Sequence, residues 1–457
     1  MAAEAAGLRR ELGVWGAASI VVGTVIGSGI FLVPKTMILQ VGDVQTLFAV
    51  WIAGGLLSLG GALTYAELSA MMPEAGGEYN YLREAYGPFF GFLYGWTQMW
   101  VAKSGSVATL ATGFFYYLAN FWPALESVAF RIPVPLGDGG ADLEIRSGQL
   151  LAMALIMTLG LINWHGLRAG AGVQIAATLL KVALIAGIVV AGLLAGRTGT
   201  GTPVPAPGGA AGFFGALVAA LWAYDGWNNV TMVAGEVKNP QRNLPLALVL
   251  GTALVVVIYI LTNLAYFHVL SPAEVAASDR VAAEMMRRLL GEGGASVVSL
   301  AAMISIFAAL NGSILSGARV PYALAVDGLF FRRFARVHEK HHVPGFSILA
   351  LSAWSSILIL TGRYDQLLTL VIFPSWILYG MATAAVFVLR RKQPDRHRSY
   401  RTVGYPIVPL LFVFVAVVLI YFTLKNSPRE SLIGLVLIAA GLPFYNHWRA
   451  KAGAKLA

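Results

Sequence analysis

Twelve apolar runs, each long enough to cross a lipid bilayer, follow one another along the whole chain. A membrane-spanning helix needs about 17 to 25 predominantly apolar residues. Hydrophobic residues make up 58% of the 457 residues and charged residues only 12%, against about 25% charged in an average soluble domain. We therefore predict an all-α polytopic membrane protein with one transmembrane domain at 1–448 and a tail at 449–457. The runs lie at approximately 14–39, 47–71, 89–121, 149–164, 173–195, 213–233, 246–270, 297–325, 346–360, 367–389, 407–424 and 432–448.

The lysines and arginines of the connecting loops indicate how these spans are oriented. If the N-terminus lies inside the cell, most of them fall in cytoplasmic loops, including the basic stretch at 390–401. Basic residues stay on the cytoplasmic side, so both termini are expected there, in a multi-pass protein of the plasma or inner membrane. The net charge of +10 is spread over short loops, so it does not indicate a nucleic-acid partner.

Several kinds of chemistry lack the residues that they need. The chain has no cysteine, which excludes disulfides, thiolate metal sites and cysteine nucleophiles. Its histidines fall in loops or near span ends, and the nucleotide-binding pattern G-x-x-x-x-G-K-[ST] does not occur. We therefore expect a transporter rather than an enzyme, with no cofactor and no metal ion, whose partners are the lipid bilayer and small-molecule substrates.

Two of the spans contain residues that interrupt a helix. The first contains GTVIGSGIFLVP, and the sixth contains LWAYDGWNN with Asp225 at membrane depth. Irregular backbone inside a bilayer survives only where it is buried in protein or lines a cavity. The two spans are the first members of successive sets of five, so the second set is inverted, as in inverted-repeat transporters whose paired broken helices form the substrate site. We expect the repeats at about 14–196 and 212–391, and two extra spans at about 405–448.

A broken helix suits a zwitterionic ligand. One half ends in unpaired carbonyl groups and the other begins with unpaired N–H groups, so the break attracts both an ammonium group and a carboxylate. The predicted carboxylate donors are the N–H groups of Ser28, Gly29 and Ile30, and the predicted ammonium acceptors are the carbonyls of Ile26, Trp222, Ala223 and Asp225. An alternative for Gly23-x-x-x-Gly27 alone is a packing face between helices. The candidate substrate-binding residues are Ile26, Gly27, Ser28, Gly29, Ile30, Trp222, Ala223, Tyr224, Asp225, Gly226 and Asn228.

Four stretches together carry a family resemblance: TVIGSGIF, ALTYAELSAMMPEAGGEYNYLREAYGP, LWAYDGWNNV and GEVKNPQRNLPLA. With them the chain resembles the amino acid/polyamine/organocation transporters, and within these the L-type branch of light subunits and their bacterial relatives. The resemblance implies a LeuT-type fold of five plus five inverted spans with two more, and sodium-independent amino acid exchange by alternating access. Animal light subunits join a heavy chain through a cysteine, which this chain lacks. A disulfide-linked heavy subunit is therefore excluded.

The resemblance also implies roles for single residues. Trp222 matches the aromatic residue that closes over the substrate, and Asn228 matches an asparagine that steadies the broken spans; core packing and a structural amide are the alternatives. Lys181 resembles the lysine that replaces a sodium ion in sodium-independent members. A buried ammonium group there could bond the carbonyls of the first span and the hydroxyls of Ser313 and Ser316. Its alternative is a lysine that extends to the membrane interface.

The remaining charged residues within the spans have weaker claims. Lys103 either lines a polar cavity or makes a contact between helices. Glu67, Glu236 and Arg319 lie near cytoplasmic span ends, as an inner gate or as solvated or locally paired side chains.

Asp225 has two interpretations that do not exclude each other. Its carboxylate caps the inner half of the sixth span by accepting from the N–H of Trp227 or Asn228, or its charge selects cationic side chains.

The sequence leaves three functions open. The first is a sodium-independent exchanger or facilitator of neutral L-amino acids, with cationic amino acids as additional candidates. The second is a proton- or sodium-coupled amino acid symporter on the same fold, and the third is a channel or membrane receptor. Sodium coupling would need an oxygen-lined site where Lys181 stands, and a channel would not need paired breaks.

Overall fold

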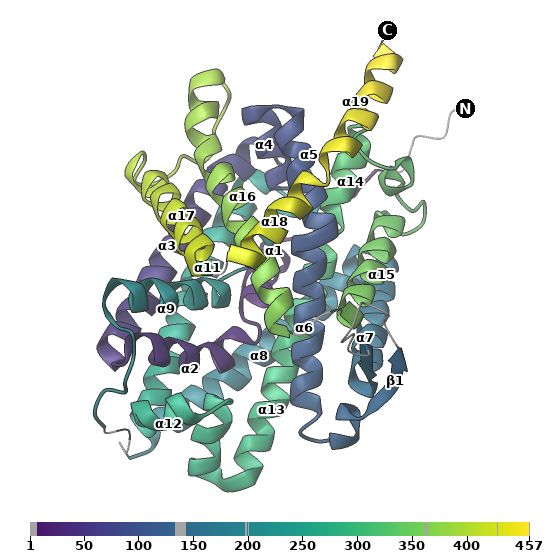
Figure 1. The fold of residues 1–457 in the computed structure, drawn as a ribbon. Coiled ribbons are helices and arrows are strands. Elements are labelled where there is room, and N and C mark those ends of the chain that lie inside the picture. Colours follow the sequence, from purple (N-terminus) through teal and green to yellow (C-terminus); the bar gives the residue numbers. More distant parts are fainter. Residues whose placement is uncertain are drawn as a thin grey trace.

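The computed structural model describes residues 7–132, 143–196, 199, 201–361, 364–426 and 428–456 (Figure 1). Its α-helices are α1 Val14–Val25, α2 Gly29–Val41, α3 Val44–Met71, α4 Glu78–Tyr86, α5 Pro88–Thr97, α6 Lys103–Leu118, α7 Ser147–Trp164, α8 Leu167–Leu194, α9 Gly209–Ala223, α10 Asn229–Met232, α11 Pro240–Val269, α12 Pro272–Ala277, α13 Val281–Gly317, α14 Arg319–Val326, α15 Gly345–Thr361, α16 Tyr364–Lys392, α17 Ile407–Asn426, α18 Pro428–Ala439 and α19 Leu442–Leu456.

Short elements complete the fold. The short π-helix η1 Gln98–Ala102 joins α5 to α6, and the 3-10 helices are η2 Pro123–Glu126, η3 Ala234–Glu236 and η4 Arg332–Ala335. The strands β1 Val128–Ile132 and β2 Leu143–Arg146 pair antiparallel, and they are the strands of the described part of the chain, which is otherwise helices, turns and loops. We call them the hairpin.

The helices are those of a multi-pass membrane protein. Within the described ranges, eight are long and apolar enough to cross a membrane, or nine if the bent pair α1 and α2 counts as one span. Three of the predicted runs fall short of this length because their helices are divided or short. Residues 89–121 are divided by η1, residues 213–233 end as α9 and α10, and α15 is only 17 residues long.

Figure 1 shows how the ends of the bundle differ. Both termini lie at one end together with α4 and α14, which we call the terminal face. The turn helix α12 and the hairpin lie at the other end, the opposite face. Between them, α1 packs on α8, α11 and α13, while α2 packs on α9. The two halves of the first span therefore have different neighbours.

The first span breaks where the sequence predicts. α1 ends at Val25, Ile26 is extended with φ −74° and ψ 92°, and α2 begins at Gly29 with a bend of 40°. Gly29 is needed because a Cβ there would lie 2.8 Å from the Cα of Ala223. The start of α2 thus touches the backbone at the end of α9.

The sixth span is more interrupted than predicted. After α9 ends at Ala223, helix α10 does not begin until Asn229 and lasts only four residues before η3. Gly226 has φ +107°, a conformation that side chains other than glycine rarely adopt. The backbone therefore cannot resume a helix directly after Asp225.

Hydrogen bonds tie the two breaks to each other. Thr24 of α1 donates its hydroxyl to the carbonyl of Gly226 at 2.8 Å. The hydroxyl of Tyr259 on α11 lies 3.0 Å from the carbonyl of Val25 and 2.8 Å from that of Ala223. One buried tyrosine therefore reaches the last carbonyl of both α1 and α9.

Candidate functional site

The two breaks enclose a small cavity with a volume of about 30 Å³. This is room for two or three water molecules, at about 10–15 Å³ each by this measure, so an amino acid enters only if the surrounding helices move. Of the predicted site residues, Ile26, Ile30, Tyr224 and Asn228 do not line it. Its lining is Thr24, Val25, Gly27, Ser28, Gly29, Ser106, Leu110, Trp222, Ala223, Asp225, Gly226, Asn229 and Ser313.

The N–H groups predicted to bind a carboxylate are well placed. Gly29 and Ile30 stand in the first turn of α2, whose N–H groups have no acceptor within the helix. Gly29 and Ser28 also line the cavity. The start of α2 therefore faces the enclosed space with the positive end of its dipole.

Three of the four carbonyls predicted to bind an amino group already accept hydrogen bonds. Ile26 accepts from the ammonium of Lys181 and from Ser305 at 2.9 Å, Ala223 accepts from Tyr259 at 2.8 Å, and Trp222 accepts from the N–H of Asp225 at 3.1 Å. The prediction of unpaired carbonyls is therefore wrong for these three, because groups of the protein bond to them first.

Lys181 of α8 reaches the first break, as its position predicts. Its side chain is fully buried, and its ammonium group donates to the carbonyl of Gly23 at 2.7 Å, to that of Ile26 and to that of Ser305 at 3.4 Å. The Ser305 hydroxyl also donates to Ile26. Lys181 and Ser305 therefore supply donors to carbonyl groups at the end of α1, where the helix breaks.

The serine partners of Lys181 differ from those predicted. The carbonyl of Ser305, rather than a group of Ser313 or Ser316, accepts from its ammonium. The Ser316 hydroxyl donates to the carbonyl of Gly312 one turn back on its own helix, and Ser313 lines the cavity instead. The prediction therefore identified the right helix, α13, but named serines at the wrong position along it.

Asp225 does not cap the inner half of the sixth span. The residue before α10 is Asn228, and no side chain caps that helix. The Asp225 carboxylate instead accepts from the hydroxyl of Tyr379 on α16 at 3.0 Å and from the N–H of Gly226. The capping interpretation is therefore wrong, because the positive φ of Gly226 delays the start of the helix.

Lys103 of α6 belongs to the same polar cluster. Its ammonium donates to the side-chain oxygen of Asn229 at 2.6 Å and attracts the carboxylate of Asp225. Lys103 is 6% exposed, so a buried ammonium group is bonded to Asn229, a residue of the cavity lining. Lys103 is not among the residues that line the central cavity, and its bond to Asn229 joins α6 to α10, so the interpretation as a contact between helices fits better.

Comparison with known proteins decides the family. The amino acid permease family model matches residues 12–442. The chain belongs to the amino acid permease family. This permease is 33% identical over 442 residues to the serine/threonine exchanger SteT of Bacillus subtilis (strain 168), covering 96% of this chain and 97% of that protein. It is 32% identical to the mouse b(0,+)-type amino acid transporter 1, covering 96% and 88%. It is 29% identical to the human cystine/glutamate transporter, covering 96% and 85%.

Glu78 is a buried charged residue of this permease that no sequence pattern singled out. It begins α4, is fully buried, and accepts from Tyr94 at 2.8 Å and from the amide of Asn228. Asn228 thus steadies the sixth span through a carboxylate 150 residues away. The only sequence signal was the position of Glu78 in the motif GGEYNY.

The three residues predicted as an inner gate separate into two sites. Glu236 and Arg319 form a buried bidentate pair at 2.7 and 2.8 Å on the terminal side of the break. Glu67 instead binds Arg390 at 2.7 and 2.9 Å and accepts from Thr402. Both carboxylates are fully buried, so these side chains are locally paired, as the alternative allowed, and not solvated.

Trp222 and Tyr224 have different surroundings. Trp222 lines both the central cavity and a cavity of about 480 Å³ beyond it, which we call the vestibule. Tyr224 is buried against Trp51 and Tyr259, and its hydroxyl donates to the carbonyl of Trp51. Trp222 is therefore placed to separate the two cavities, whereas Tyr224 belongs to the packing behind them.

Gly29→Ala is expected to reduce amino acid exchange by about tenfold or more, because its methyl group would lie 2.8 Å from the backbone of Ala223. Such overpacking costs about 1–3 kcal/mol, and 1.36 kcal/mol corresponds to about tenfold in rate. The matched control is Gly27→Ala, whose methyl would meet Leu110 and Ala309 at ordinary distances of 3.5 and 3.6 Å. Initial exchange rates in proteoliposomes compare the two, and equal rates would contradict the expected close contact.

Proposed function

We propose that this permease is a sodium-independent exchanger of neutral L-amino acids that works by alternating access. The observation that carries the proposal is the Lys181 ammonium at the break of the first span. By the family resemblance, a lysine there supplies the fixed charge that a sodium-coupled relative would take from a metal ion. The names of the serine/threonine exchanger and the b(0,+)-type transporter support amino acid cargo.

The proposed architecture has twelve spans, of which ten form two inverted repeats and two follow them. The breaks in the first and sixth spans, which meet at one cavity, support the inverted arrangement. Both termini are proposed to lie in the cytoplasm, because the basic loops favour that orientation. The vestibule then opens outward and the buried pair of Glu236 and Arg319 closes the inner side.

A zwitterion fits the charges of this site. The first turn of α2 attracts the carboxylate, and Asp225 lies on the cavity wall to attract the ammonium group. The ammonium of Lys103 attracts the carboxylate of Asp225, which favours neutral over cationic side chains. Substrates are thus read mainly by their backbone charges.

A counterflow panel of the common amino acids in proteoliposomes tests the proposal. Exchange of small neutral amino acids is expected to be unchanged when choline replaces sodium and when no pH gradient is present. A requirement for an inward proton gradient would support the symporter alternative, and a steep sodium dependence would exclude the proposed mechanism.

Asp225→Asn tests whether this carboxylate also selects cationic cargo. Removing it takes away the larger of the two carboxylate attractions on Lys103, the other being that of Glu78. The KM for arginine is therefore expected to rise about tenfold or more, while the KM for alanine changes by less than about threefold. The control is Tyr379→Phe, which removes the hydrogen bond to Asp225 but keeps the charge. A wild-type protein that ignores every cationic amino acid would end this part of the proposal.

A further inference from the structure

The vestibule connects the central cavity to the surface of the opposite face. It shares Gly29 and Trp222 with the central cavity. It shares Tyr116 and Asp279 with a third cavity of about 520 Å³ farther out. The three cavities therefore follow one another, and a substrate that approaches from this face meets Tyr116 and Asp279 before it meets Trp222.

One ion pair stands at this point. The ammonium of Lys35, on α2, lies 2.5 Å from the carboxylate of Asp279, in the loop before α13. Lys35 is 30% exposed and Asp279 is 75% exposed, so water and solutes reach both groups. The hydrogen bond and charge of Lys35 lower the pKa of Asp279 below its ordinary value. The carboxylate therefore stays ionised at neutral and mildly acid pH.

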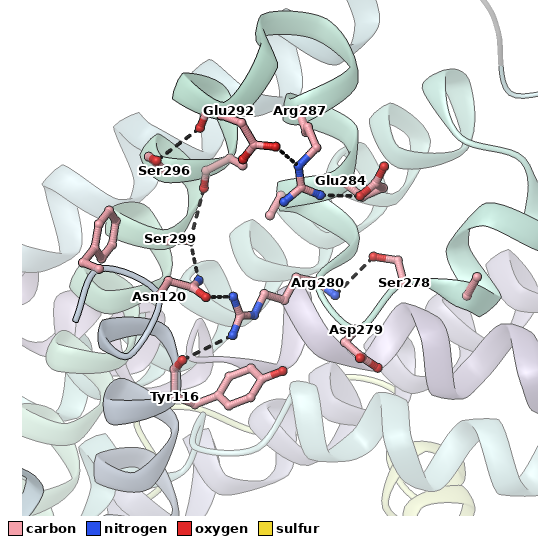
Figure 2. A pocket seen from close by; sticks show the side chains of 14 residues that line it. Tyr116, Asn120, Ser278, Asp279, Arg280, Glu284, Arg287, Glu292, Ser296 and Ser299 are labelled. Carbon is pink, nitrogen blue, oxygen red and sulfur yellow. Dashed lines mark hydrogen bonds and ion pairs between the residues drawn. The ribbon is translucent and has the colours of Figure 1, made fainter. Parts of the chain in front are cut away.

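The neighbouring charges are engaged elsewhere. Figure 2 shows Arg280 reaching toward Asn120 and the carbonyl of Tyr116, and its guanidinium lies 4.4 Å from the centre of the Tyr116 ring. Arg287 is paired with Glu284 and Glu292. Among the described residues that line the vestibule, Lys35 and Asp279 are the charged ones. These two side chains therefore provide the charges of the vestibule lining.

We propose that Lys35 and Asp279 form an entry site for zwitterionic amino acids, separate from the central cavity. The ammonium group of the ligand takes the place of Lys35 on the Asp279 carboxylate, and its carboxylate takes the place of Asp279 on the Lys35 ammonium. This exchange replaces one ion pair with two, so no charge is left unpaired. The vestibule is within the range of about 300–1,000 Å³ that is usual for small-molecule sites, whereas the central cavity is too small until the helices move.

This inference rests on the proposed function, since it concerns how the same cargo reaches the central site. Lys35→Gln and Asp279→Asn are each expected to raise the KM for alanine about two- to fivefold when it is added at the opposite face, in line with the modest strength of exposed ion pairs. The KM at the terminal face is expected to stay unchanged. Arg131→Gln, which removes an exposed pair with Glu144 on the hairpin, is the matched control and should change neither value.

Two one-charge inhibitors separate an entry site from a simple latch between α2 and the loop. Leucinamide keeps only the ammonium group, and 4-methylpentanoate keeps only the carboxylate. Lys35→Gln should weaken inhibition by 4-methylpentanoate alone, and Asp279→Asn should weaken inhibition by leucinamide alone. A latch predicts that both variants change both inhibitors alike, and that result would overturn the entry site, as would a wild-type protein that neither compound inhibits. Wild-type protein without any alanine exchange would instead count against the proposed function.

Discussion

Lys181→Met is expected to lower amino acid exchange about a hundredfold or more while the protein still inserts in the membrane. The substitution removes the donor to the carbonyls of Gly23, Ile26 and Ser305. Hydrogen bonds to a charged group contribute about 1.5–3 kcal/mol each, and carbonyls left buried without a donor cost a further 1–3 kcal/mol or so. About 2.7 kcal/mol already corresponds to a hundredfold change in rate.

The control for this variant is Ser305→Ala. It removes the hydroxyl that lies 2.9 Å from Ile26 and 3.1 Å from Gly27, but it leaves the ammonium in place. We expect a loss of less than about tenfold, because a neutral hydrogen bond contributes about 0.5–1.5 kcal/mol. If Lys181→Met retained wild-type exchange in choline buffer, the role assigned to this lysine would be wrong.

Glu236→Gln is expected to lower the free energy of unfolding by about 3–5 kcal/mol, because it leaves Arg319 buried without its counter-charge. Arg319 is 1% exposed, and its guanidinium donates two hydrogen bonds to this carboxylate and one to the carbonyl of Leu315. Thermal unfolding in detergent measures the loss, and exchange should fall with it. The terminal side of the site would then be poorly closed.

Two further variants make this prediction specific. Arg287→Gln removes two ion pairs, whose carboxylate partners Glu284 and Glu292 are 41% and 82% exposed, so it should cost less than about 1 kcal/mol. The double variant Glu236→Met and Arg319→Met removes both charges, and it should recover part of the stability lost in Glu236→Gln. Equal stability of Glu236→Gln and the wild type would show that the pair does not carry a buried charge interaction.

The features that follow from local sequence were predictable. The break of the first span was predicted from glycine spacing, and the structure places Gly29 where a side chain would strike Ala223. Lys181 was predicted to act at the first break because the family resemblance implies that role, and because a lysine in the middle of an apolar helix needs a polar partner. In each case the residue type itself imposes a constraint that few backbones satisfy.

The depth of a contact along a helix was not predictable. Ser305 and Ser316 are eleven residues apart, which is close to three full turns, so both lie on nearly the same face about 16 Å apart along the axis. Periodicity therefore identifies the face that meets Lys181 but not the turn. Only the packing of α13 against α8 selects Ser305.

Contacts between segments that lie far apart in the sequence were likewise not predictable. No residue near Glu78 in the sequence indicates its hydrogen bond with Asn228, because this contact depends on how α4 packs against the sixth span. The capping role of Asp225 was a sound local expectation. It failed because Gly226 takes φ +107° and moves the helix start to Asn229.

Tyr259 has a consequence for the energy of movement. Its hydroxyl has one proton, yet it lies within bonding distance of the carbonyls of Val25 and Ala223, which end the two half-helices at the breaks. If one half-helix moves away, the proton can remain with the carbonyl of the other, so the donor is never left without an acceptor. The hydroxyl of Tyr259 can therefore change its acceptor, so the half-helices can separate without the free-energy cost of an unbonded hydroxyl.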